Sequence, residues 1–213
     1  MKRLAFACML VLAMAVAAYA FLAYGALPLG KLVGPEMRAN FLAHRVGIYV
    51  HVFAAAIALA LGPFQFWERP RRRFPRLHRM SGRVYLGVGV GLGGIAGLYM
   101  ATFAYGGLVA KSGFAALAIS WLYTGWRAWR AIRGGDIGEH RRWITRNFGL
   151  TLAAVTLRIL LPLSGVSGIP FALAYPAIAW LCWVPNLLLA EWGFVRRIPV
   201  ARERLARTLS ANG

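Results

Sequence analysis

The chain has 213 residues, of which 60% are hydrophobic and only 15% are charged, and its mean hydropathy is +0.59. This composition excludes an ordinary soluble domain and indicates a protein that lies in a bilayer. The net charge of +19 would suggest nucleic acid as the partner of a soluble protein, but in a membrane protein unequal loop charge accounts for it. We therefore expect no nucleic-acid binding.

Six segments have the roughly 20 apolar residues that a membrane-spanning helix needs. We expect spans at residues 4–26, 42–66, 84–104, 108–126, 144–163 and 171–194. Because the connections are short, the sequence predicts one all-α integral membrane domain over residues 1–213. This domain is a bundle of six transmembrane helices, and its last segment, 195–213, is a basic tail.

The first segment also has the features of a cleavable signal peptide, because a basic start and an apolar run precede the small-residue pattern Ala18-Tyr19-Ala20. Its apolar stretch continues through residues 21–27, which is longer than a usual signal core. We favour a retained helix. Cleavage, the alternative, would leave the other five spans in the same orientation.

Basic residues are distributed unequally between the two sides of the predicted bundle. Of 25 lysines and arginines, Lys31, Arg38 and Lys111 lie on one side and Arg45 and Arg158 lie within spans, which leaves 20 on the side of the N-terminus. By the positive-inside rule, both termini should be cytoplasmic. The cytoplasmic face should then contact anionic lipid headgroups.

Glycines recur four residues apart in the third span. The pairs are Gly87 and Gly91, Gly89 and Gly93, and Gly93 and Gly97. Residues without side chains let two helices approach closely, so we expect tight helix packing here. The alternative is a flat cofactor such as haem lying against the glycines.

The fifth span carries a polar stripe. His140, Asn147, Thr151 and Arg158 are seven, four and seven residues apart, so they share one helix face. Arg158 should lie in the outer half of the membrane, level with His51 and without a carboxylate partner. Its partners should be backbone carbonyls, a neutral His51 or an anionic ligand. The alternative is that Arg158 reaches the outer surface and binds lipid phosphate.

A second polar layer is expected at the cytoplasmic face. Glu191 should pair with a nearby arginine, because an unpaired carboxylate would be costly there. Asn186, next to Pro185, can satisfy a carbonyl that the proline frees. Asp136 can cap the helix that restarts after Gly134-Gly135. The members of this layer are His78, Arg83, His140, Arg142, Arg146, Asn147, Asn186 and Glu191.

Two histidines precede spans and could converge on one ion. His78 and His140 would suit a haem b iron or another metal, whereas anionic lipid headgroups are the alternative ligand in such cation-rich loops. Cys8 and Cys182 have no metal-type spacing. No nucleophile elbow, phosphate loop or paired carboxylates point to hydrolase or kinase chemistry.

Several blocks of the chain resemble a bacterial family of predicted membrane proteins of unknown function. They are GPFQF at residues 62–66, LHRMSGRVYL at 77–86, the segment 112–162 with HRRWITR, and AWLCWVPNLLLAE at 179–191. The family often has Met at the position of Ile144. The resemblance implies a bacterial inner-membrane protein and brings no known reaction. It places the following residues in recurrent blocks: His51, Gln65, His78, Arg83, His140, Arg146, Arg158, Asn186 and Glu191.

Three functional interpretations follow. The first is binding, or transport, of an anionic lipid or small ligand in a polar intramembrane cavity. The second is a redox protein that holds haem b or a quinone with His78, His140 or His51. The third is a purely structural role for the polar layers. The candidate ligand-binding residues are His51, Gln65, Arg83, Arg146, Asn147, Thr151, Arg158, Asn186 and Glu191, and the candidate metal or haem ligands are His78 and His140.

Overall fold

The computed structural model describes residues 2–198, and all regular elements within that range are helical. This confirms the predicted all-α class. Most of the predicted basic tail, residues 199–213, lies outside the described residues. The elements in chain order are α1 (Lys2–Gly25), α2 (Pro35–Ala43), α3 (Arg45–Phe66), α4 (Glu68–Arg73), α5 (Pro75–Val84), the π-helix η1 (Tyr85–Leu92), α6 (Gly93–Ala101), α7 (Gly107–Arg133), α8 (Ile137–Thr151), α9 (Ala153–Val166), α10 (Phe171–Leu181), α11 (Val184–Gly193) and the 3₁₀ turn η2 (Val195–Arg197).

Five helical segments among the described residues are long and apolar enough to cross a membrane. They are Leu4–Gly25, Arg45–Phe66, Pro75–Ala101, Ile137–Val166 and Phe171–Arg197. The fourth predicted span, 108–126, lies in α7, which has 27 residues but is not among the five. This helix has one cation, Lys111, near its start and three, Arg127, Arg130 and Arg133, near its end.

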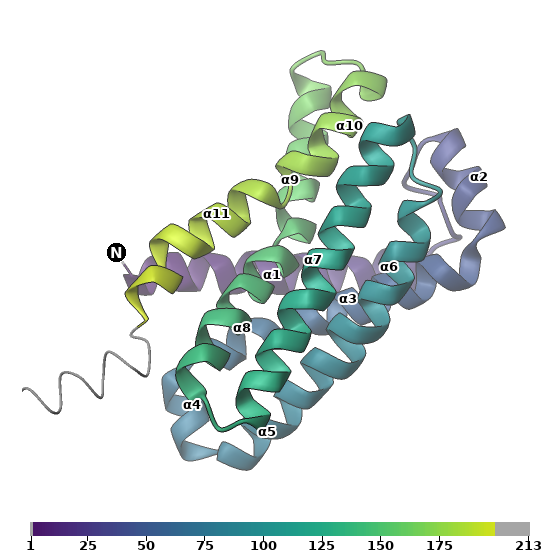
Figure 1. Cartoon of the computed structure of the whole chain (residues 1–213). Helices are drawn as coiled ribbons and strands as arrows, with labels where there is room; N and C mark the ends of the chain where they lie inside the picture. Colours follow the sequence, from purple (N-terminus) through teal and green to yellow (C-terminus); the bar gives the residue numbers. More distant parts are fainter. Residues whose placement is uncertain (1, 199–213) are drawn as a thin grey trace, which may run out of the picture.

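Helix α7 packs against α6, α8 and α10 (Figure 1). On the other side of α6, α3 packs along η1 and α6, and α1 packs on α3 and touches α9. The largest core cluster contains Tyr85, Trp121, Phe148 and Leu150, which come from η1, α7 and α8. The core of the helix bundle is therefore built from residues of different predicted spans.

The basic segments gather at one end of the bundle. In Figure 1, α4, α5 and the α7–α8 connection lie together at the lower end, whereas α2 and the α6–α7 and α9–α10 connections lie at the upper end. The Phe6 ring contacts Trp67 at the end of α3, with 6.2 Å between ring centroids, so the start of α1 also belongs to the arginine-rich end. This arrangement is the one that the charge distribution predicts.

Close helix packing explains Gly89 and Gly97 of the third span, whereas Gly87 has no neighbour within 4 Å. A Cβ atom at Gly89 would lie 2.7 Å from Ala58 Cβ and 3.0 Å from Ala58 Cα, and one at Gly97 would lie 2.8 Å from the His51 ring. The predicted tight packing is confirmed at these positions. The alternative of a flat cofactor on the same glycines is not supported there, because α3 already fills the space.

The helices are more interrupted than the sequence predicts. The predicted fifth span is divided at Leu152 into α8 and α9, and the sixth is divided at Cys182 and Trp183 into α10 and α11. Thr151 Oγ1 donates a hydrogen bond to Asn147 O at 3.0 Å, and bonds of this kind bend helices. Pro185 in the first turn of α11 favours a new helix start.

Candidate functional site

Three residues of the predicted polar stripe of the fifth span lie in contacts between helices. The His140 Nδ1 atom donates to Ala128 O of α7 at 2.8 Å. Asn147 and Thr151 are 0% and 5% exposed. These three side chains therefore point into the contact between helices.

Asn147 is the centre of a closed hydrogen-bond network. Its Oδ1 accepts from the Tyr85 hydroxyl at 2.7 Å, and its Nδ2 donates to Trp121 O at 2.8 Å and Thr124 Oγ1 at 2.9 Å. Thr151 Oγ1 accepts from Trp121 Nε1 at 2.9 Å and lies 2.9 Å from the Tyr85 hydroxyl. Each of these groups has a protein partner, so the network joins η1, α7 and α8 without a ligand.

Arg158 is half-buried and faces α1. It donates from Nη1 to Ala154 O at 3.1 Å, and its Cζ lies 5.4 Å from the centroid of the Tyr19 ring. The described residues include no carboxylate paired with it. His51 lies close enough to Arg158 for their charges to interact. However, the His51 Nδ1 atom forms a 2.8 Å hydrogen bond with Gly93 O of α6 and not with Arg158.

Two further candidates have local partners. Gln65 donates to Ser81 Oγ at 3.0 Å and so joins α3 to α5. Asn186 donates from Nδ2 to Thr156 Oγ1 at 2.9 Å and to Cys182 O at 3.0 Å. Asn186 thus satisfies the backbone carbonyl of Cys182, at the break between α10 and α11, whereas the carbonyl four residues before Pro185 is that of Leu181.

The histidine pair has no metal cluster around it. No group of three or more His, Cys, Asp or Glu side chains lies together among residues 2–198. His78 and His140 are close enough for their charges to interact. The His78 Nδ1 atom is buried and has no hydrogen-bond partner among the described residues. Arg83, another candidate of this layer, is exposed. Ligation of an ion by the two histidines stays a prediction.

The structure contains a hollow of about 340 Å³ between α7, α8 and α11. One part of its wall is aliphatic and the other is polar and aromatic. A wall of this mixed kind suits an amphipathic ligand. The lining residues are Ser120, Tyr123, Thr124, Trp143, Arg146, Leu187, Leu188 and Glu191.

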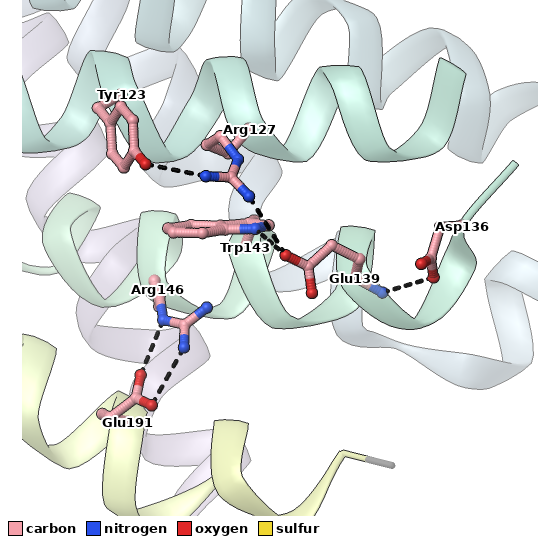
Figure 2. A network of polar contacts seen from close by, with 7 residues as sticks. All are labelled: Tyr123, Arg127, Asp136, Glu139, Trp143, Arg146 and Glu191. Atoms are coloured by element: carbon pink, nitrogen blue, oxygen red, sulfur yellow. Dashed lines mark hydrogen bonds and ion pairs between the residues drawn. The ribbon is translucent and has the colours of Figure 1, made fainter. Parts of the chain in front are cut away.

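Trp143 lies between two guanidinium groups beside this hollow (Figure 2). The Cζ atoms of Arg127 and Arg146 lie 4.6 Å and 4.5 Å from its ring centroid. Its Nε1 donates to Glu139 Oε1 at 2.6 Å, and Arg127 Nη2 is 3.6 Å from the same oxygen. Arg127 also donates to the Tyr123 hydroxyl at 2.9 Å. This arrangement fixes the guanidinium groups on both faces of the indole ring.

Glu191 pairs with Arg146 across the hollow, which confirms that an arginine partners this carboxylate. Arg146 donates from Nε to Oε2 at 2.7 Å and from Nη2 to Oε1 at 3.1 Å. Arg142 and Arg196 also lie within electrostatic range of the carboxylate. Neither forms an ion pair within the described part of the chain, so positive charge exceeds negative charge around Glu191.

Local sequence signals explain how α8 presents these groups. Gly135, with φ of +78°, forms the connection from α7, a conformation that glycine adopts easily. Asp136 Oδ1 accepts from the Glu139 backbone N–H at 2.9 Å, so the predicted cap is confirmed. Trp143 and Arg146 then lie three residues apart on one side of α8.

Sequence reasoning missed the roles of Arg127, Glu139 and Trp143. The spacing of Glu139, Trp143 and Arg146 along one helix face was an available signal. The position of α11 beside that face had no comparable signal, because it depends on the break between α10 and α11.

Comparison with known proteins places most of the chain in a protein family. Residues 48–193 match the model of a family described as "Predicted membrane protein (DUF2306)". No curated protein and no solved structure matches the chain. The matched range contains all the residues that line the hollow and omits α1 and α2.

Proposed function

Because the chain belongs to the predicted membrane protein family DUF2306, we propose that it is a multi-pass protein of the bacterial inner membrane that binds an anionic phospholipid. The proposed site is the hollow between α7, α8 and α11. The observation that carries this proposal is the combination of aliphatic Leu187 and Leu188 with the cation Arg146 in one lining.

An anionic phospholipid fits this lining in two ways. Its acyl chain would lie along the leucines of α11, which are apolar like the lipid tail. Its phosphate would lie at the end where Arg146 and Trp143 meet, since guanidinium groups bind phosphate oxygens in pairs. The arginines around Glu191 would favour an anionic over a zwitterionic headgroup.

The orientation is also part of the proposal. We take α7 as a sixth crossing, supported by its 27 residues and by its connections at opposite ends of the bundle in Figure 1. An even number of crossings puts both termini on the arginine-rich side, which the positive-inside rule assigns to the cytoplasm. Reporter fusions at each terminus should therefore both give cytoplasmic signals. Signals on opposite sides of the membrane would contradict six crossings.

Filling the hollow should remove bound lipid. We expect Leu188→Trp to lower the affinity for phosphatidylglycerol about tenfold or more, because the larger side chain occupies the space of the ligand. Leu189→Trp is the matched control, since Leu189 is the next residue of α11, is 66% exposed and does not line the hollow. Native mass spectrometry of protein from phosphatidylglycerol and phosphatidylcholine nanodiscs measures the retained lipid.

Two results would contradict the proposal. One is equal retention of phosphatidylglycerol by the two tryptophan variants. The other is equally tight binding of inorganic phosphate to the detergent-solubilised protein, because a lipid site needs the acyl chain as well as the phosphate.

A further inference from the structure

The Arg146 side chain presents to Glu191 the same two donors that would bind a phosphate. Nε and Nη2 each donate to a different carboxylate oxygen, at 2.7 Å and 3.1 Å. Phosphate oxygens accept from the same edge of a guanidinium group. Glu191 therefore occupies the position in which the headgroup of an anionic lipid would bind most strongly.

Arg146 does not depend on Glu191 alone for its position. Its Cζ lies 4.5 Å from the centroid of the Trp143 ring, and Trp143 is itself held by its hydrogen bond to Glu139. If the carboxylate moved away, the guanidinium group would still lie against the indole ring at the edge of the hollow. The side chains of Arg146 and Glu191 are 17% and 30% exposed, so a ligand can reach the pair.

The helix that carries Glu191 has one side packed on α8 and one side exposed. Within α11, Ala190 is the buried residue, whereas Leu188 and Leu189 are 41% and 66% exposed. The helical structure is interrupted at Cys182 and Trp183, just before this helix. Asn186 still ties the start of α11 to Thr156 of α9 at 2.9 Å. The far end of α11 is held as well, because Ala190 and Val195 are 7% and 0% exposed, so the Glu191 carboxylate would leave Arg146 by rotation of its own side chain and not by movement of the helix.

From these observations we infer that Glu191 is an internal competitor of the ligand. The phosphate of an anionic lipid displaces the Glu191 carboxylate from Arg146, and the Arg146–Glu191 ion pair closes the site when the lipid is absent. This inference rests on the proposed function, since it needs the hollow to be the lipid site. It predicts that loss of an acidic group at the site strengthens binding.

The test is the affinity of full-length Glu191→Gln for phosphatidylglycerol, measured by lipid exchange in nanodiscs. The neutral amide is a weaker acceptor for Arg146, so we expect binding about fivefold tighter than in the wild-type protein. Glu68→Gln is the matched control, because it removes the same charge from an exposed residue of α4 that pairs with Arg71 and Arg72. This control should change the affinity less than about twofold, because an exposed charge far from the hollow contributes little to the binding free energy.

The outcomes separate the inference from the proposed function. Unchanged or weaker binding by folded Glu191→Gln, with lipid still lost from Leu188→Trp, overturns the competitor role and leaves the lipid site in place. Equal gains in Glu191→Gln and Glu68→Gln also overturn it, because they would report net charge alone. Should Glu191→Gln not fold, Glu191→Asp, whose carboxylate is one methylene shorter, should give a smaller gain in the same direction, and no gain there overturns the inference.

Discussion

Replacing Asn147 with Leu is expected to destabilise the protein by about 3 kcal/mol or more. The two side chains have the same number of heavy atoms and both branch at Cγ, but the methyl groups of Leu cannot accept from Tyr85 or donate to Trp121 O and Thr124 Oγ1. Asn147 is 0% exposed, so water cannot replace these bonds. Thermal unfolding in a single detergent, followed by circular dichroism, measures the loss.

A second asparagine provides the control for this prediction. Asn40 makes one side-chain bond, to Phe103 O at 3.0 Å, in a part-buried position. Asn40→Leu should therefore cost about 1 kcal/mol. If Asn147→Leu unfolded at the wild-type temperature, the network would not be a structural element, and its polar groups would again be candidates for ligand binding.

Replacing Trp143 with Leu is expected to reduce both stability and lipid binding. The change removes the ring from between Arg127 and Arg146 and the hydrogen bond to Glu139. We estimate a loss of about 2–3 kcal/mol from the contacts and the buried ring area. Trp143→Phe keeps an aromatic face and should lose about 1 kcal/mol.

The same substitution tests how Arg146 is held. In the Trp143→Leu background, Glu191→Gln should no longer strengthen phosphatidylglycerol binding, because Arg146 would lack both of its supports. Lipid exchange with the two single variants and the double variant gives the comparison. A full gain in the double variant would mean that Trp143 does not position Arg146.

Features that depend on one helix were predictable from the sequence. Apolar length predicted most of the membrane-spanning helices, and glycine spacing predicted close helix packing, which the structure has between Gly89 and Ala58. Asp136 was recognised as a cap from its position after two glycines. Glu191 was expected to pair with an arginine, because a lone carboxylate is unfavourable at that depth.

Features that depend on how helices lie beside each other were not predictable. The face shared by His140, Asn147, Thr151 and Arg158 was identified, but periodicity cannot tell whether such a face meets a cavity or another helix. The structure shows that Asn147 and Thr151 meet Tyr85 and Trp121. It likewise shows that Arg158 meets Tyr19 of α1, a contact between spans far apart in the sequence.

The central claim is that an anionic phospholipid binds beside Leu188, and photocrosslinking tests it most directly. A photoreactive phenylalanine analogue is placed at position 188 or 189 in nanodiscs that contain phosphatidylglycerol and phosphatidylcholine, and mass spectrometry identifies the attached lipid. Position 189 reports the bulk mixture, since Leu189 is exposed and outside the hollow. We expect phosphatidylglycerol to be enriched at position 188 relative to position 189, and identical lipid ratios at the two positions would contradict the claim.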